Sequence, residues 1–375
     1  MRPSSPHFVS SLTIAARPAP SAQAGFGKRL QEAFFPTFWS GLATIALSAM
    51  LLWLGFRFFG WALPGAVFIP DAAACRALDF QHACWGFIAE KYRLILFGRY
   101  PYDEQWRPLI ALLVVGGTLV VTALPRFWSR YLLWLWFVAL AIFFVLMTGG
   151  GPFATIGLSR VDTVQWGGLP LTVLLTLVSM VASIPIGVLL ALGRRSTLPV
   201  VRTVCTSYIE LVRGVPLITV LFMASFVLPL FFPQGVRSDA LTRILIGLTL
   251  FQAAYLAETL RGGLQAIPRG QYEAAQSLGL GYWRTQALVI LPQAFVHVIP
   301  ALVNNLLSML MDTSLVTVVS MYDLTGALRL ALGDALWRNF FIEGYLFIAL
   351  IYFAACFTLS RYSRWLERRM QQTSD

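Results

Sequence analysis

Two pairs of opposite charges stand inside stretches of the sequence that are otherwise apolar. Glu210 and Arg213 are three residues apart, and so are Glu258 and Arg261. Residues three apart share one face of a helix, so each pair can neutralise itself. A charge inside a membrane-length segment is costly without a partner or a polar path. We therefore predict two ion pairs that support the structure or a gate, in preference to contacting a substrate.

A third polar group recurs at four-residue steps. Asn304, Ser308 and Asp312 would form one stripe about 12 Å long on a helix that rises ~1.5 Å per residue. The stripe fits either hydrogen bonding between helices or the wall of a translocation path. In a path it would offer amide and carboxylate groups to a zwitterion, with Asp312 facing the ammonium group. Further candidates for this path are Thr313, Ser314 and, more weakly, Gln252.

The composition indicates an integral membrane protein. Of the 375 residues, 58% are hydrophobic and 12% are charged, whereas about 25% are charged in soluble domains. Several apolar runs approach the roughly 20 residues that a helix needs to cross a bilayer, so we predict an all-α protein and exclude a barrel. The eight predicted spans are residues 37–59, 108–125, 131–149, 168–193, 208–231, 242–262, 287–312 and 341–363.

The distribution of basic residues predicts the orientation of these spans. An even number of spans places both termini on one side, and 17 of the 28 Lys and Arg residues then lie there. Since basic residues concentrate in cytoplasmic loops, we expect both termini in the cytoplasm. The formal net charge of +11 is then a topology signal. Basic residues scattered among short loops form no continuous face, which argues against nucleic acid as a partner.

Breaks in composition divide the chain into three parts. Residues 1–35 read as a disordered cytoplasmic tail, because they are rich in Ser, Ala, Pro and Arg. Residues 36–150 hold three spans and a long outer loop, in which residues 87–97 look amphipathic and suited to the membrane surface. The Gly-rich sequence from residue 149 opens a link to five further spans, in residues 151–375.

Cysteine and nucleotide chemistry are limited. Cys75 and Cys84 share the outer loop and would form either a disulfide or two free thiols; no cysteine belongs to a C-x-x-C pair. The chain has only two lysines, Lys28 and Lys91, and neither lies in a phosphate-binding loop sequence. We therefore expect no ATPase site, no catalytic residue and no metal site on this chain.

The connection across residues 266–292 is unusual between two membrane spans. Helical residues up to Leu278 precede Gly279, which is placed to end a helix in the left-handed conformation, and Gly281 would keep the turn open. A second helical run continues to Leu291 and Pro292, where the next span starts. Small and apolar groups replace the Ser, Gly and Lys of a solvated linker. An ordinary polar connector remains the alternative, but we predict a docking helix-turn-helix for a cytoplasmic protein.

Glu273-Ala274-Ala275, then Gly279, Val289 and Leu291-Pro292, resemble the signature E-A-A-x3-G-x9-I-x-L-P of permease subunits of ABC importers. Val289 in place of isoleucine is the one departure. Four stretches resemble polar amino-acid permeases of the histidine and glutamine type: YIELVRGVPLITVLF (208–222), AETLRGGLQAIPRGQYEAAQSLGL (257–280), LPQAFVHVIPALVNN (291–305) and DTSLVTVVSMYDL (312–324). That family usually has lysine where Met311 stands, so no role of that lysine is transferred. The three additional spans and residues 84–108 resemble the M-type permease of the general L-amino-acid transporters.

The resemblance implies a five-helix permease core that follows three additional helices. It implies the bacterial inner membrane, an L-amino acid substrate and a coupling loop held by a cytoplasmic ATPase dimer, on which ATP and Mg²⁺ would bind. Other implied partners are a periplasmic amino-acid-binding protein, a second, Q-type permease and membrane lipid, and a homodimer of permeases remains open. The rival interpretations are an ion-coupled secondary transporter and a non-transporting scaffold.

Overall fold

The structure is a computed structural model that describes residues 26–129, 131–231, 233 and 238–372. Within these residues it is almost entirely helical, which confirms the predicted all-α membrane fold. Seven helices are long and apolar enough to cross a membrane, and the number is eight if a bent pair of helices is counted as one span. The chain forms two compact units, one of Met1–Ala66 with Phe80–Ala83 and one of Val67–Asp79 with Cys84–Asp375.

The first unit consists of a short and a long helix, α1 (Phe26–Phe34) and α2 (Phe38–Ala62). Between them Thr37 and Ser40 form a capping box, in which each side chain bonds to the other's backbone N–H. The helix α1 corrects the prediction of a disordered tail for residues 26–34, where apolar residues at four-residue spacing favour an amphipathic helix. Residues 1–25 of the predicted tail lie outside the described residues.

The second unit contains the remaining helices and one very short strand. In chain order these are α3 (Ala72–Arg76), α4 (Gly86–Phe97), η1 (Tyr102–Glu104), α5 (Trp106–Ala123), η2 (Pro125–Phe127), α6 (Tyr131–Thr148), η3 (Gly151–Ile156), η4 (Thr163–Gln165), α7 (Gly168–Arg194), α8 (Pro199–Gly214), α9 (Leu217–Phe222), η5 (Met223–Val227), η6 (Leu228–Phe231), α10 (Ala240–Ala266), α11 (Arg269–Ser277), α12 (Tyr282–Thr285), η7 (Gln286–Ile290), α13 (Leu291–Asp312), η8 (Thr313–Val319), β1 (Tyr322–Asp323), α14 (Leu324–Leu332) and α15 (Phe341–Gln372). The division of the chain at residues 150 and 151 stays a prediction.

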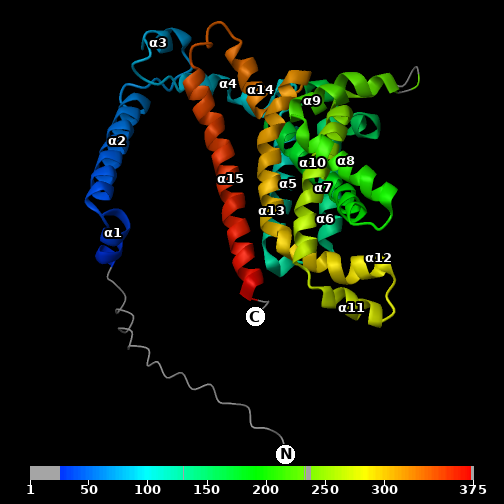
Figure 1. Cartoon of the computed structure of the whole chain (residues 1–375). Coiled ribbons are helices and arrows are strands. Elements are labelled where there is room, and N and C mark those ends of the chain that lie inside the picture. The colour runs from blue at the N-terminus through cyan, green and yellow to red at the C-terminus, as the bar shows by residue number, and fades with distance from the viewer. Residues whose placement is uncertain (1–25, 130, 232, 234–237, 373–375) are drawn as a thin grey trace, which may run out of the picture. The chain divides into compact units, whose positions relative to one another are not determined.

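The centre of this unit is the pair α7 and α10, which pack along most of their length. Gly187 on α7 and Gly263 on α10 leave no room for a Cβ, because Leu256 and Val298 press against them. Buried alanines on α10 allow the same close approach, as small residues do in membrane helix pairs. Helices α8 and α13 pack against α10, and α5 joins α6 to α7 (Figure 1).

The span predicted at residues 208–231 is not a continuous helix. Helix α8 already begins at Pro199 and ends at Gly214, and the following helical stretch to Phe231 is turned by 108° relative to it. Pro216 lies at this break, with φ −59° and ψ 141°. Because a proline disfavours helical backbone in the residue before it, Val215 is extended and the helix ends. The single span predicted here is therefore broken into two helical stretches.

The outer loop contributes α3 and α4 to a cap, and α14 and the start of α15 complete it. Phe87 and Ile95 of α4 are buried in a core with Leu324 and Leu328 of α14. The prediction that residues 87–97 lie along the membrane surface is thus wrong, because other helices of the protein cover the apolar face of α4. A surface lipid and a protein core select the same amphipathic pattern.

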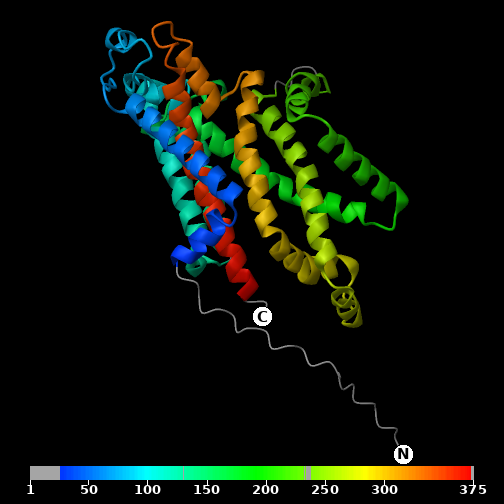
Figure 2. The same ribbon diagram turned by 60° about the vertical axis from the view of Figure 1, so that its left-hand side comes forward.

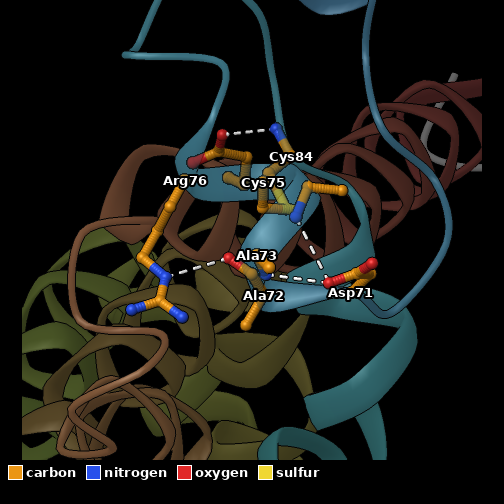
Figure 3. Close-up of a disulfide and its surroundings, with 8 residues drawn as sticks. Asp71, Ala72, Ala73, Cys75, Arg76 and Cys84 are labelled. Carbon is orange, nitrogen blue, oxygen red and sulfur yellow. Dashed lines mark hydrogen bonds between the residues drawn. A yellow bond between two sulfur atoms is a disulfide. The ribbon is translucent and has the colours of Figure 1, made fainter.

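A disulfide joins Cys75 and Cys84 inside the cap, as one of the two predicted alternatives has it. Asp71 precedes α3 and accepts hydrogen bonds from the N–H groups of Ala73 and Ala74, at 2.8 Å and 3.2 Å (Figure 3). The N–H of Cys84 donates to Glu343 of α15 at 2.8 Å. The covalent link thus holds together two segments of the loop, and Glu343 fixes this loop to the last span.

Arg107 is fully buried at the end of α6 and binds the carbonyl groups that this helix leaves unpaired. Its Nε donates to Leu146 O at 2.7 Å, its Nη1 donates to Ser159 O at 2.9 Å, and Glu104 forms an ion pair with it. The Tyr100 hydroxyl donates to the Leu146 and Met147 carbonyls. Burial raises the pKa of Tyr100, so its hydroxyl stays protonated as a donor. One arginine thereby connects α5, α6 and the Gly-rich link.

Replacing Arg107 by leucine should destabilise the protein, because Glu104 would lose its ion-pair partner and Ser159 O would lose its donor. We expect Arg107→Leu to cost about 3 kcal/mol, measured as a lower unfolding temperature of the detergent-solubilised chain. Arg160→Leu is the matched control, since the pair of Arg160 with Asp162 is mostly exposed, and it should cost less than ~1 kcal/mol. Equal shifts in the two variants would contradict this account.

The disulfide predicts the number of reactive thiols. In the denatured, unreduced chain only Cys205 and Cys356 should react with a maleimide polymer, because these two are free. After reduction all four cysteines should react. The variant Cys75→Ser should expose Cys84 and give three adducts without reductant. Four adducts on the unreduced protein would show that the bond does not form in cells.

Candidate functional site

The coupling segment, residues 266–292, folds as two short helices joined by a tight turn. Helix α11 ends in a Schellman motif: the N–H of Gly279 donates to Gln276 O at 2.9 Å, and that of Leu280 to Ala275 O at 3.1 Å. Gly279 has φ +74° as predicted, a conformation that side chains disfavour. Gly281 has φ −70°, which any residue adopts. The turn thus depends on a glycine at residue 279 alone.

Most of the predicted docking residues point away from the bundle. Ala275 is buried, whereas Glu273, Ala274, Gly279 and Gly281 are exposed. Leu278 is 80% exposed, although it follows the buried Ala275 by three residues. Trp283 is also exposed, at 65%. Exposed apolar groups on a protruding segment are typical of a protein interface.

The second helix of the segment runs directly into a span through a wide turn. A π turn, η7 (Gln286–Ile290), lies immediately before α13. Pro292 lies in the first turn of α13, where its missing N–H costs nothing, and Leu291 begins that helix. No pattern in the sequence indicates the π turn, because apolar periodicity does not separate α from π geometry over five residues.

A charge network joins three helices near the start of the coupling segment. Glu258 of α10 pairs with Arg261 at 2.5 Å, as predicted, and with Arg194 of α7 at 3.1 Å. Arg213 of α8 also approaches Glu258, at 3.7 Å. Glu210 pairs with Arg194 at 3.2 Å, so the predicted Glu210–Arg213 pair is replaced by bonds to other helices. A single carboxylate thus serves three arginines, which draws the ends of α7, α8 and α10 together.

The polar stripe on α13 is largely uncovered by the rest of the subunit. Asn304 and Ser308 are exposed, and Asp312 is half-buried, as is Ser314. The neighbouring residue Asn305 bonds across helices, because it donates to Thr259 of α10 at 3.0 Å. Helix–helix hydrogen bonding is therefore the role of Asn305, while Asn304 and Ser308 face away from the subunit's own core.

Two other candidates for the path are enclosed by the subunit itself. Thr313 is fully buried and donates to Leu310 O at 2.8 Å. Gln252 is buried between α10 and α7, where its Nε2 lies 3.5 Å from Met180 Sδ. The candidate path is consequently reduced to the open stripe and Ser314.

At the opposite end of the unit, Asp323 starts α14 and holds the turn that follows η8. Its carboxylate accepts from Gly326 N–H at 2.8 Å and from the Tyr352 hydroxyl at 3.2 Å. Burial raises the pKa of Asp323, and these hydrogen bonds partly oppose the increase. Thr172 of α7 also receives the N–H of Leu324, at 3.0 Å. Residues 312–324 thus connect η8 and α14 to α7.

The comparisons with known proteins agree with this geometry. A family model described as binding-protein-dependent transport system inner membrane component matches residues 183–372. The chain belongs to this family. The match includes the whole coupling segment and the charge network. Membership confirms the ABC importer permease predicted from the resemblance, over the ion-coupled secondary transporter.

Individual relatives extend the similarity of this permease beyond the family model. The inner membrane amino-acid ABC transporter permease protein YhdY of Escherichia coli is 49% identical over 76% of this chain and 78% of its own length. The glutamate/glutamine/aspartate/asparagine transport system permease protein BztC of Rhodobacter capsulatus is 36% identical over 97% of this chain and 98% of its own length. A crystal structure of an amino acid ABC transporter with histidines is 35% identical, with TM-score 0.47, over 54% of this chain and 92% of that chain.

Glu258 should matter more to the permease than Glu210 does. Glu258→Gln leaves three arginines without their shared anion, so we expect it to cost roughly 1–2 kcal/mol, discounted for partial exposure. Glu210→Gln removes one pair of a mostly exposed carboxylate and should cost less than ~0.5 kcal/mol. Thermal unfolding of the two purified variants tests the order, and a larger loss in Glu210→Gln would refute the central role of Glu258.

Proposed function

We propose that this permease moves an L-amino acid across the bacterial inner membrane and is driven through its coupling segment by a separate, cytoplasmic ATPase dimer. The observation that carries the proposal is the protruding helix-turn-helix with Gly279 at φ +74° and exposed apolar groups on either side. ATP and Mg²⁺ would bind to the ATPase partner. The lack of a phosphate-binding loop sequence around either lysine of the chain supports this division of work.

The amino-acid substrate is inferred from the relatives and from the open stripe on α13. YhdY and BztC are both named as permeases for amino acids. Asn304, Ser308, Asp312 and Ser314 supply amide, hydroxyl and carboxylate groups, which suit a zwitterion with both a donor and an acceptor end. A periplasmic binding protein would deliver the amino acid to the end of the bundle that carries α4 and α14.

The exposed stripe also supports a second permease subunit. Polar side chains on a membrane-length helix are costly in lipid, and they normally face a bundle interior or a water-filled cavity. Asn304 and Ser308 are exposed on this subunit. A homologous partner, of the Q type by resemblance, would cover them and complete the path between the two subunits. A homodimer would cover them in the same way.

Both termini are proposed to be cytoplasmic. Arg361, Arg364, Arg368 and Arg369 lie in the last turns of α15, which ends on the same side of the unit as α11 and α12 (Figure 1). Arg269 and Arg284 of the coupling segment add to this basic end. A concentration of arginine at one end of the spans favours the cytoplasmic side.

A pair of glycine substitutions tests the coupling role. At both residues 279 and 281 an added Cβ meets nothing within 4 Å, so any difference comes from the backbone. Gly279→Ala must hold a left-handed conformation, which costs about 1 kcal/mol or more. We expect it to loosen the turn, to weaken ATPase co-purification and to lower uptake of L-glutamine. Gly281→Ala should leave both unchanged.

Membrane insertion of the two glycine variants should be equal, as judged by their amounts in purified inner membranes. Normal uptake and normal ATPase association in Gly279→Ala would contradict the coupling role. If uptake alone is lost while the ATPase still co-purifies, the segment transmits the motion, and other residues hold the ATPase.

A further inference from the structure

Two hollows meet at one arginine beside the coupling segment. The larger, of about 540 Å³, lies between the end of α7, the start of α8 and α12. The smaller, of about 290 Å³, lies between the end of α7 and the helices α11 and α12. Leu192, Arg195 and Tyr282 line both. The two hollows are therefore neighbours, with Arg195 at their junction.

The walls of the two hollows differ in chemistry. The larger is mainly apolar, with Leu189, Leu198, Val201 and Trp283 along it. The smaller presents hydrogen-bonding groups, among them Thr285 and Gln286. An apolar space and a polar space joined at a cation match the two parts of an amphiphile with an anionic head.

Both hollows lie at the depth where membrane spans end. The span of α7 ends at Arg194, and the span that includes α13 begins at Tyr282. The side chains of Tyr282 and Trp283 are exposed at this level. Aromatic residues of this kind collect where hydrocarbon meets the lipid headgroups. In Figure 2 the turn from α7 to α8 lies at the side of the unit, above the coupling segment.

Arg195 has donors left for a ligand. Its Nη1 donates to Leu264 O at 3.1 Å and to the Tyr272 hydroxyl at 3.4 Å. Within the described part of the chain, its Nε and Nη2 have no hydrogen-bond acceptor, and no acidic side chain lines either hollow. The exposed fraction of Gln286 is only 5%. Within the described residues, no hydrogen-bond donor reaches its Oε1.

We propose that these hollows seat one anionic phospholipid of the phosphatidylglycerol type, from the leaflet on the side of the coupling segment. Its phosphate lies against Arg195, since a guanidinium binds phosphate oxygens with two parallel donors. One acyl chain follows the apolar hollow past Leu189. The glycerol headgroup enters the polar hollow near Gln286, where its hydroxyl groups supply the donors that an amide oxygen accepts.

The rim of the larger hollow favours a lipid over a soluble anion. Leu189, Leu198 and Trp283 are 58%, 61% and 65% exposed, so large apolar side chains surround its opening. Contact with an acyl chain removes this surface from water or gives it a packed neighbour. Next to the hollow, Gly193 of α7 is so close to Cys205 of α8 that a Cβ would not fit. Helices α7 and α8 therefore contact each other behind the acyl chain.

A lipid in this place would touch the spans and the coupling segment together. Leu189 belongs to α7, Val201 to α8, and Tyr282 to α12. The lipid would thus set the position of the coupling segment against the membrane end of α7. This consequence for transport rests on the proposed function, whereas the binding of the lipid does not.

The test is native mass spectrometry of the full chain in mild detergent, with dioleoyl-phosphatidylglycerol or dioleoyl-phosphatidylcholine added. We expect selective retention of one phosphatidylglycerol molecule. Arg195→Gln should weaken it roughly fivefold, the effect of one basic residue at an anionic lipid surface. Leu189→Trp, which fills the apolar hollow and leaves Arg195 in place, should weaken it at least as much.

Two matched variants serve as controls. Arg202→Gln repeats the arginine exchange at an exposed residue of α8 that lines neither hollow. Leu211→Trp repeats the leucine exchange at an exposed residue of the same helix, which also lines neither hollow. Both should retain the lipid. If the Arg195→Gln variant does not insert into the membrane, the lipid retention of the Leu189→Trp variant decides the test. Equal retention of both lipids, unchanged retention in the variants that line the hollows, or displacement by an equal concentration of glycerol phosphate would overturn the proposal.

Discussion

The need to neutralise one carboxylate at the edge of the hydrocarbon determines how the helices of the core end. Glu258 lies within α10, and its oxygens are shared by Arg194, Arg213 and Arg261. A carboxylate with little access to water must keep such partners, because an unpaired charge is costly there. Since the arginines come from α7, α8 and α10, the same requirement fixes where these three helices meet. The coupling segment begins only two turns later.

Helices α7 and α10 each run as one continuous helix between the two ends of the unit. Each has 27 residues, which is about 40 Å of helix. Close packing at Gly187 and Gly263 leaves no slack between these helices and their neighbours. At one end they meet the charge network and the coupling segment, and at the other the turn at Asp323. A displacement at one end is therefore transmitted along packed, stiff elements.

Local patterns predicted most of the architecture and the coupling segment. The left-handed conformation of Gly279 depends on residues within one turn of the helix, so its position in the sequence was sufficient to predict it. The spans follow from apolar runs in the same way. The break at Pro216 within the span predicted at residues 208–231 was missed, because the sequence does not reveal whether tertiary packing will tolerate a continuous helix.

Contacts between distant residues could not be predicted. Glu210 and Arg213 satisfy the three-residue spacing, yet Glu210 binds Arg194, 16 residues away. Arg107 binds Leu146 O, 39 residues away. Helix α4 carries an amphipathic pattern that fits a lipid surface and a protein neighbour equally well, and only the position of α14 decides between them. The hollows beside Arg195 combine parts of α7, α8 and the coupling segment, and no single stretch of sequence signals such a site.

The contact between Cys84 and Glu343 has a consequence for biogenesis. These residues are 259 positions apart, so a ribosome synthesises the outer loop long before its partner in the last span. Cys75 and Cys84 are nine residues apart and can pair early, but the apolar side of α4 stays uncovered until α14 and α15 follow. The cap is thus completed only after the last span has been synthesised.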